Sequence, residues 1–457
     1  MKKFRTYFAF LLCILVIFTT SAPAFAAQSD APALSARAAM LVDLQSGRAL
    51  LSHNADEKVY PASLTKIMTC LLALENSNLD DIVTVSESAL AGIDPDGTTA
   101  DLKPGEEISM NDLLHCITVY SANEACNVIA EHVSGSVSAF LALMNQRAAE
   151  LGCTGTHFTN THGLHDEANY TTVRDLYLIT EAALEHEAFR LMTAKTSYTV
   201  PATNLSAERK LNTSNYLISR QSREDYYYPL ATGIKTGFTT PAGRCLISRA
   251  SNGTLDLLVI VCGAATMIDT NGNLMIESFT DAKSLFEYGF NTFRAVTLVT
   301  PLEPLGSIPV TLSANVASSV FAPAEKITTL LPRDYDPELV ERIIKLDNPD
   351  GMEAPVAKDQ KVGTVEVRYN GEIIGSTDLL AIAAIERSFM KQLGSSISAF
   401  FQSSAWNIIL AVIAFLALAF VITLIILYLR ARRNRKRRRD LRRREQMLSK
   451  MHGGNES

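Results

Sequence analysis

The stretch "VYPASLTKIMTCLLALE", Val59 to Glu75, places a serine and a lysine three residues apart at the start of an apolar run with helical spacing. Residues three apart lie on one face of a helix, so Ser63 and Lys66 can meet. Two interpretations are open. Either Ser63 caps the helix and Lys66 lies on a solvated face, or Ser63 is a nucleophile with Lys66 as its base. The Ser-x-x-Lys pattern alone favours the cap, because such matches arise by chance.

Two later motifs reverse this preference. The segment "VYSANEACNVIAEH" contains Ser121-Ala-Asn123 at the head of a helical pattern, and "GIKTGFT" contains Lys235-Thr-Gly237 at the start of a strand-like region. Ser-x-x-Lys, Ser-x-Asn and Lys-Thr-Gly in this order are the signature set of the penicillin-recognising serine acyl enzymes. The ordered set therefore predicts that Ser63 is a nucleophile.

The first two motifs supply groups for acyl transfer. We expect Ser63 to attack a carbonyl and form an acyl-enzyme, with Lys66 as general base once burial or a neighbouring cation lowers its pKa. Ser121 is predicted to relay a proton to the leaving amine. Asn123 is predicted to hold Lys66 and the substrate amide.

The third motif supplies groups for substrate binding. Lys235 provides a positive field that attracts a substrate carboxylate, and Thr236 is predicted to bind that carboxylate. Gly237 is expected to let the substrate backbone lie against the strand edge, where a side chain would obstruct it. We expect the backbone N–H groups of Ser63 and Phe238 to form the oxyanion hole.

With these motifs the sequence resembles the D-alanyl-D-alanine carboxypeptidases of the low-molecular-weight penicillin-binding proteins, over roughly residues 35–385. The resemblance extends to "VDLQSGRALLSHNADE", "LKPGEEISMNDLL", "GSVSAFLALMNQRAAELG", "THFTNTHGL", "YTTVRDL" and "GIKTGFTTPAGRCL". It implies that the substrate is a peptidoglycan stem pentapeptide ending in D-Ala-D-Ala, from which the terminal D-alanine is removed. It also implies inhibition by β-lactams, and it requires no metal and no cofactor.

One position departs from the family pattern. Members often carry an arginine shortly before the closing helix, thought to help hold the substrate carboxylate, and Ser278 stands at the matching place. Arg244, near the start of the next strand, is predicted to substitute for it. His162 and Asp175 invite a Ser-His-Asp triad, but a lysine base is already present and no G-x-S-x-G elbow exists. We therefore assign them structural roles.

The order of elements predicts an α/β fold. Residues 36–52 read as a hairpin, helical patterns follow from 63 to 184, and two apolar runs joined by Ser251-Asn252-Gly253 precede a closing helix at "FTDAKSLFEYGF". This order suggests a penicillin-binding or β-lactamase-like transpeptidase domain over 35–292, with an antiparallel sheet, covered by helices, that takes strands from both ends. Short β-like runs with a turn at Asn370-Gly371 then predict a small all-β domain over 295–385.

Both ends of the chain look like targeting or anchoring segments. Residues 1–26 have the basic start, apolar run and small-residue site of a signal peptide, with an uncleaved anchor as the alternative. A juxtamembrane segment, 386–405, precedes an uncharged run, 406–429, that is long enough to span a bilayer. The tail 430–457 is strongly basic, which beside a span predicts a cytoplasmic C-terminus and an extracytoplasmic catalytic domain in the cell membrane.

Charge and cysteines limit the partners and the redox chemistry. The whole chain carries −6, and without its two basic ends the exported part carries about −18, which disfavours nucleic acid as a partner. Six cysteines remain after signal removal, an even count that permits disulfides. The apolar surroundings of Cys70, Cys126 and Cys262 favour buried thiols instead.

Three other interpretations compete. A β-lactamase shares the motifs, but one class needs an E-x-x-L-N segment between the second and third motifs, and none occurs. A catalytically silent wall scaffold would have lost a motif residue, and none is lost. A signalling role for the basic tail is possible in principle, but topology suffices to explain its charge.

Overall fold

The computed structural model describes residues 31–93, 97–268, 272 and 274–452, with side chains described as far as residue 448. The predicted signal segment, 1–26, lies outside the described residues. The chain divides into two compact units. Unit 1 runs to Thr297 and also takes Thr328–Val340, and unit 2 comprises Leu298–Ile327 and the chain from Glu341 onward.

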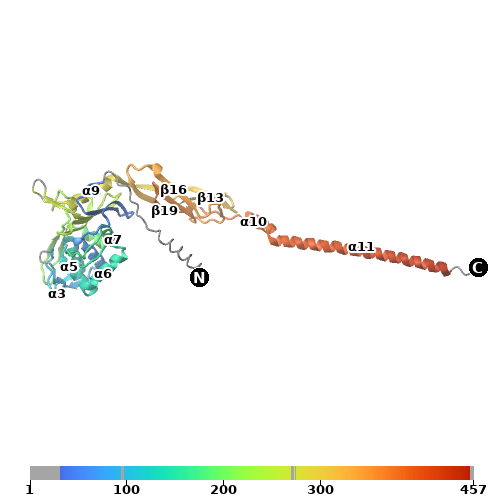
Figure 1. Ribbon diagram of the computed structural model, residues 1–457, viewed down its shortest axis with the longest axis horizontal. Coiled ribbons are helices and arrows are strands. Elements are labelled where there is room, and N and C mark those ends of the chain that lie inside the picture. The colour runs from blue at the N-terminus through green and yellow to red at the C-terminus, as the bar shows by residue number, and fades with distance from the viewer. Residues whose placement is uncertain (1–30, 94–96, 269–271, 273, 453–457) are drawn as a thin grey trace, which may run out of the picture. The chain divides into compact units, whose positions relative to one another are not determined.

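The described residues of unit 1 up to Thr297 appear in blue to yellow in Figure 1. Unit 1 is built on a five-stranded antiparallel sheet with strand order β2-β1-β9-β8-β7. The strands are β1 (Ala38–Asp43), β2 (Arg48–His53), β7 (Ala231–Thr239), β8 (Gly243–Ser251) and β9 (Asp256–Ala264). Ala38 pairs with Cys262 and Asp43 with Leu257, so strands from the two ends of the unit lie side by side. The predicted sheet, with strands from both ends, is confirmed.

Both faces of this sheet are buried, which explains the unbroken apolar runs in its central strands. Side chains alternate between faces along a strand. In β9, Leu258 and Ile260 therefore belong to one hydrophobic cluster, and Leu257 and Val259 belong to another. A strand buried on both sides reads as a continuous apolar run.

Helices cover the two faces unequally. The helices packed into the larger cluster are α2 (Lys66–Asn76), α4 (Met110–His115), α5 (Asn123–Ser134), α6 (Val137–Glu150), α7 (Val173–Glu185) and α8 (Glu187–Thr193). On the other face, α9 (Glu277–Thr292) contributes Phe279, Leu285 and Phe286. The predicted closing helix is α9, whereas α8 was not predicted.

Shorter elements connect these parts. They are η1 (Ala62–Thr65), β3 (Ile82–Thr84), α3 (Glu87–Leu90), β4 (Glu107–Ser109), η2 (Cys116–Tyr120), β5 (Ser197–Val200), β6 (Arg209–Asn212), β10 (Thr266–Ile268), β11 (Leu274–Ile276), β12 (Phe293–Val299), β15 (Ile327–Pro332) and η3 (Pro337–Leu339). Side-chain caps fix several starts: the hydroxyl of Ser109 accepts the N–H of Asp112 before α4, and Thr172 accepts that of Asp175 before α7. A missing cap typically costs about 1 kcal/mol.

Unit 2 holds a six-stranded sheet with order β16-β18-β19-β14-β13-β17. Its strands are β13 (Gly306–Thr311), β14 (Ser318–Pro323), β16 (Val340–Leu346), β17 (Met352–Glu353), β18 (Lys361–Tyr369) and β19 (Glu372–Ala381). The predicted hairpin turn joins β18 to β19, with φ of 50° at Asn370 and 81° at Gly371. Two successive left-handed residues favour Asn-Gly, which explains this sequence.

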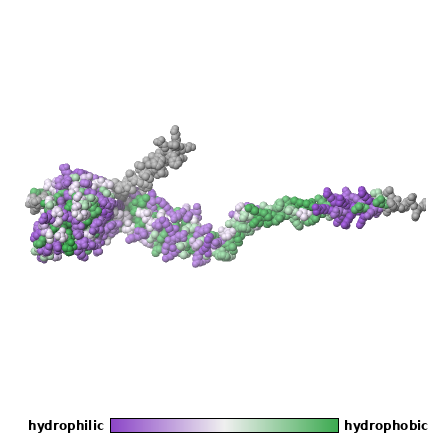
Figure 2. All heavy atoms as spheres, turned by 90° about the horizontal axis from the view of Figure 1, so that it is seen from below, coloured by the Kyte–Doolittle hydropathy of each residue, from purple (hydrophilic) through white to green (hydrophobic). Residues whose placement is uncertain are grey.

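Two helices follow in unit 2. Helix α10 (Phe389–Gln402) exposes Phe389, Met390 and Phe401, and it ends at Ser403, whose backbone is extended. Helix α11 (Ser404–His452) is long and apolar enough to cross a membrane. Figure 2 shows its hydrophobic stretch followed by a hydrophilic one. Helices α5 and α6 pass the same test only as a bent pair, and many of their residues are buried in unit 1.

The six cysteines from Cys70 to Cys262 are free and buried. The predicted buried thiols are therefore confirmed. Burial raises the pKa of Cys70, Cys116 and Cys126, so these groups behave as small apolar side chains rather than as nucleophiles.

Candidate active site

A cleft of about 390 Å³ in unit 1 collects the predicted site residues from four segments. Its lining includes Ser63, Ser121, Asn123, Thr236, Gly237, Phe238 and Arg244. Lys66 and Lys235 lie behind this lining and are 1% and 3% exposed. Polar groups that converge in a cleft, with buried lysines behind them, are typical of a catalytic site.

Ser63 lies in the short 3-10 helix η1, and Lys66 begins α2 directly after it. The nitrogen Nζ of Lys66 lies 3.1 Å from Oγ of Ser63. It also donates to Oδ1 of Asn123 at 2.7 Å and to the backbone oxygen of His162 at 2.6 Å. No side-chain cap forms at the start of η1 or α2, so neither the capping serine nor the solvated lysine of the first interpretation is found.

Ser121 occupies a special backbone position between two helices. The π-helix η2 ends at Ser121, whose φ is 71°, and α5 begins at Asn123 rather than at Ser121. A non-glycine residue in this left-handed region is uncommon and often belongs to a functional site. The turn directs the Ser121 hydroxyl to Lys235, whose Nζ donates to it at 3.0 Å.

Burial dominates the electrostatics of the two lysines. It lowers the pKa of Lys66 to about 8, while Cys126 and Glu124 oppose the shift. Burial, and then the charge of Lys66, lowers the pKa of Lys235 to about 7. Two ammonium groups in one water-poor site disfavour each other, so near neutral pH the pair readily loses one proton.

Strand β7 forms the edge of the sheet beside the cleft. The hydroxyl groups of Thr236 and Ser214 hydrogen-bond to each other, and both residues line the cleft. A Cβ on Gly237 would lie 3.1 Å from the backbone nitrogen of Ser63 and 3.2 Å from the backbone oxygen of Pro61. The glycine therefore permits the close packing of β7 on η1. That it also lets the substrate backbone lie along the strand edge stays a prediction.

Arg244 and Ser278 both line the cleft. The guanidinium of Arg244 lies 4.0 Å from the centre of the Phe238 ring, and its Nε donates to Oγ1 of Thr266 at 3.1 Å. Among the residues that the structure describes, no carboxylate forms an ion pair with it. Arg244 thus brings an uncompensated positive charge to the cleft.

His162 and Asp175 do not form a triad with Ser63. Asp175 accepts hydrogen bonds from the N–H of Gly155 and the hydroxyl of Thr156. Burial, and then the nearby Lys66, lowers the pKa of His162 to about 3, so its ring is neutral. His162 contacts Lys66 through its backbone oxygen, a contact that the sequence did not reveal.

Two further residues were missed. Ser214, beside Thr236, belongs to no motif, and only its spatial position identifies it. Glu124 follows Asn123 directly and is 3% exposed, which is unusual for an acid. Its place beside the second motif was the available signal. Within the described part of the chain, no group of three or more His, Cys, Asp or Glu residues could hold a metal ion.

Comparisons with known proteins agree with this geometry. A family model described as D-alanyl-D-alanine carboxypeptidase matches residues 25–266, and one described as penicillin-binding protein 5, C-terminal domain, matches residues 314–387. The chain is 32% identical to the D-alanyl-D-alanine carboxypeptidase DacC of Escherichia coli K12, over 81% of this chain and 90% of that protein. It is 28% identical to DacF of Bacillus subtilis 168, over 81% and 92% of the two chains.

Solved structures give the same result. Penicillin-binding protein 5 from Haemophilus influenzae matches with a TM-score of 0.60 and 26% identity, over 78% of this chain and 99% of that one. The predicted fold class is confirmed: an α/β domain of this type precedes a small all-β domain and one apolar helix.

Proposed function

Since the chain belongs to the D-alanyl-D-alanine carboxypeptidase family, we propose that it removes the terminal D-alanine from peptidoglycan stem pentapeptides through an acyl-enzyme on Ser63. The observation that carries this proposal is the contact of 3.1 Å between the Ser63 hydroxyl and the buried Nζ of Lys66. A nucleophile needs a base within hydrogen-bond reach, and that base must be neutral at the working pH.

The surroundings of Lys66 suit a neutral amine. A neutral amine has two N–H donors and one lone pair. Asn123 Oδ1 and the His162 backbone oxygen accept the two N–H groups, at 2.7 and 2.6 Å. The lone pair is then free to accept the proton of Ser63. With a pKa of about 8, roughly a tenth of Lys66 is neutral at pH 7 and about half is neutral at pH 8.

The reaction then proceeds in two halves. Oγ of Ser63 bonds to the carbonyl carbon of the penultimate D-alanine as its proton passes to Lys66. The negative oxygen of the tetrahedral intermediate accepts from the backbone N–H groups of Ser63 and Phe238. The C–N bond breaks, the leaving D-alanine takes the hydroxyl proton of Ser121, and Lys235 returns a proton to Ser121 across their contact of 3.0 Å. Water then hydrolyses the ester, with the same groups acting in reverse.

The terminal carboxylate of the substrate binds in the cleft beside Thr236 of β7. The hydroxyl groups of Thr236 and Ser214 line the cleft there as neutral donors, and Lys235 and Arg244 supply positive charge. Arg244 occupies the role that an arginine before the closing helix has in relatives, where this chain has Ser278. A β-lactam presents a comparable carbonyl and carboxylate, so β-lactams inhibit by acylating Ser63.

We further propose the membrane topology. Helix α11 crosses the cell membrane through residues 406–429, with the domains 35–292 and 295–385 outside and the basic tail in the cytoplasm. An apolar helix of sufficient length and the eleven basic residues between Arg430 and Arg444 support this topology. Residues 1–26 act as the signal peptide.

The test uses the full chain purified in detergent. It should release D-alanine from a diacyl-L-Lys-D-Ala-D-Ala peptide, and mass spectrometry should find a penicilloyl adduct on Ser63. The Ser63→Ala variant should do neither. D-alanine release that persists in Ser63→Ala would refute the mechanism, and rapid turnover of bound penicillin would indicate a β-lactamase instead.

A further inference from the structure

Glu124 is a buried carboxylate that the mechanism above does not use. It is the second residue of α5, directly after Asn123, and it is 3% exposed. Its Oε1 accepts the N–H of Ala100 at 2.6 Å. Among the described residues, Oε2 has no hydrogen-bond donor and no lysine or arginine lies within ion-pair distance. A buried acid without a cationic partner is costly, so its presence requires an explanation.

The first explanation is that Glu124 holds a segment of the cleft wall in place. Gly97 and Thr98 line the cleft, and Ala100 belongs to the same segment. The N–H of Asn123 donates to the backbone oxygen of Thr98 at 2.8 Å, and the carboxylate of Glu124 binds Ala100. Two consecutive residues of α5 therefore hold this wall segment, and one of them also contacts Lys66.

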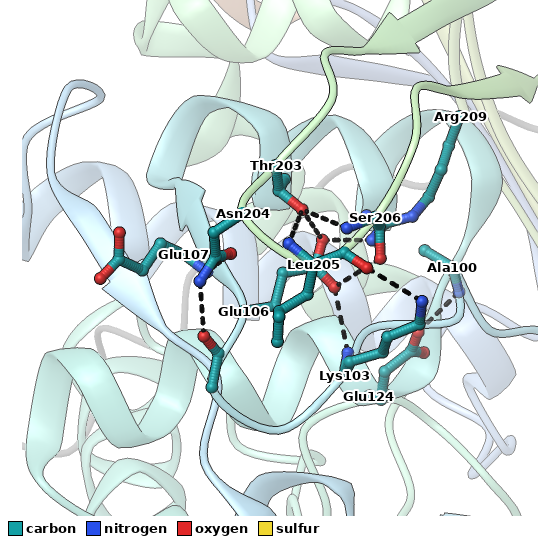
Figure 3. A network of polar contacts seen from close by, with 11 residues as sticks. Ala100, Lys103, Glu106, Glu107, Glu124, Thr203, Asn204, Leu205, Ser206 and Arg209 are labelled. Carbon is teal, nitrogen blue, oxygen red and sulfur yellow. Dashed lines mark hydrogen bonds and ion pairs between the residues drawn. The ribbon is translucent and has the colours of Figure 1, made fainter.

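The far end of the same segment is held by a second buried acid (Figure 3). Glu106 accepts the backbone N–H of Lys103 at 3.1 Å and pairs with Arg209. The hydroxyl groups of Thr203 and Ser206 also donate to Glu106. Glu106 has a full set of donors and a cation, so its burial is explained by structure alone. Glu124 has only backbone N–H donors, and among the described residues no cation pairs with it.

The second explanation is that the negative charge of Glu124 acts on the ammonium group of Lys66. The titratable and charged groups that face Lys66 or Glu124 are Lys235 of β7, Cys126 of α5, His162 before α7, Asp101 of the wall segment and Cys116 of η2. Of the two acids in this set, Glu124 is buried and Asp101 is exposed. Glu124 is therefore the buried acid whose charge acts on Lys66; burial raises the pKa of Glu124 itself, and backbone N–H groups oppose that shift.

We propose that Glu124 is a positioning residue for this reaction: its carboxylate fixes the wall segment 97–102 to α5 and balances the positive charge of Lys66. The inference rests on the proposed role of Lys66 as base. Burial drives the pKa of Lys66 down, and the charge of Glu124 opposes that shift. A base with too low a pKa accepts a proton poorly, so Glu124 keeps Lys66 basic enough to act.

The experiment compares pH profiles of kcat/KM for D-alanine release. The full chain in detergent is measured as wild type, Glu124→Gln, Glu124→Asp and Glu131→Gln. Gln retains an acceptor for Ala100 but removes the charge. Glu131 lies two turns along α5 and binds Ser86, so Glu131→Gln is the matched control. Ser63→Ala is measured in the same series.

In Glu124→Gln the acid limb of the profile should move to lower pH by about 0.5 to 1 unit, because the charge that raises the pKa of Lys66 is gone. The limb should stay in place in Glu131→Gln. An unmoved limb in Glu124→Gln overturns the proposal, whether or not activity falls, because a purely structural residue would not move it.

If Glu124→Gln does not fold, Glu124→Asp decides. It keeps the charge but shortens the reach to Ala100, so the limb should stay within about 0.2 unit while kcat/KM falls at least severalfold. A moved limb or an undiminished kcat/KM overturns the proposal. If the wild type releases no D-alanine, or if Ser63→Ala remains active, the proposed function itself is refuted. Both outcomes differ from an unmoved acid limb, which refutes only the role of Glu124.

Discussion

Replacing Lys66 with methionine should stabilise the fold more at neutral pH than at alkaline pH. Methionine fills a similar volume but binds no proton. In the wild type the ammonium of Lys66 loses its hydration on folding, and three protein oxygens replace that hydration only in part. The variant removes this penalty, and it also leaves Asn123 and His162 without a donor, a cost that does not depend on pH.

The magnitude follows from the pKa of Lys66, which falls from 10.5 to about 8 on folding. Between these values the unfolded chain binds more protons than the folded chain, so the stability of the wild type rises with pH. Each pKa unit is about 1.4 kcal/mol, so the penalty is about 3 kcal/mol below pH 7. By pH 9.5 about 2 kcal/mol of it is relieved. The variant lacks this contribution of Lys66 and keeps only that of Lys235, whose pKa burial also lowers.

The assay is differential scanning calorimetry of the full chain in detergent at pH 7.0 and 9.5. For a unit of this size, 2 kcal/mol corresponds to a Tm change of about 4 to 8 °C. The Tm of the wild type should rise by about that much relative to Lys66→Met. Lys235 adds to the same difference between wild type and variant, because the charge of Lys66 lowers the pKa of Lys235 and methionine carries no charge.

The control is Lys210→Met, at an exposed position on β6. Its Tm should follow that of the wild type at both pH values. If the Tm difference between wild type and Lys66→Met stays within about 1 °C across this range, Lys66 is an ordinary ammonium in the resting enzyme. Its assignment as general base would then lose its physical basis.

Three further outcomes are expected. Gly237→Val should lower kcat/KM about tenfold or more and cost about 1 to 3 kcal/mol of stability, because its side chain meets the backbone beside Ser63; an unaffected variant would contradict the close packing of β7 on η1. Arg244→Ala should raise KM for the D-Ala-D-Ala peptide about tenfold while Arg244→Lys recovers part of it, and an unchanged KM argues against a carboxylate contact. Replacing Asn370-Gly371 by two alanines should lower the free energy of unfolding of unit 2 by about 1 to 2 kcal/mol, since both residues have positive φ. Calorimetry should detect this loss, while D-alanine release should stay unchanged.

Local patterns predicted most of the fold because they report burial directly. The unbroken apolar runs of β1 and β9, the Asn370-Gly371 turn and the apolar spacing of α2, α5 and α7 each depend on near neighbours. The helix α8 was missed because its seven residues are too few for a clear period. The start of α5 was misjudged by two residues, because the left-handed Ser121 follows a π-turn that leaves no mark in composition.

The site was predicted as a set of residue types, and its geometry was not. The three motifs named Ser63, Lys66 and Lys235, but nothing local indicated that the backbone oxygen of His162 would accept from Lys66. The close packing of Gly237 on η1 was also hidden from the sequence, since η1 is more than 170 residues away along the chain. Contacts of this kind depend on how distant segments meet. The chemical roles of these residues stay predictions until they are measured.

The pairing of β1 with β9 also imposes an order of events on the growing chain. Ala38 finds its partner only at Cys262, more than two hundred residues later, and this pair is central to the sheet that carries η1 and β7. Long-range pairing of this kind slows folding, because a large loop must close before any contact rewards it. The helices between these two strands are synthesised before β9, so their apolar faces remain exposed until β9 pairs with β1. The active site therefore forms only after β9 has been synthesised, and a chain that ends before β9 lacks the strand that joins β1 to β8 and β7.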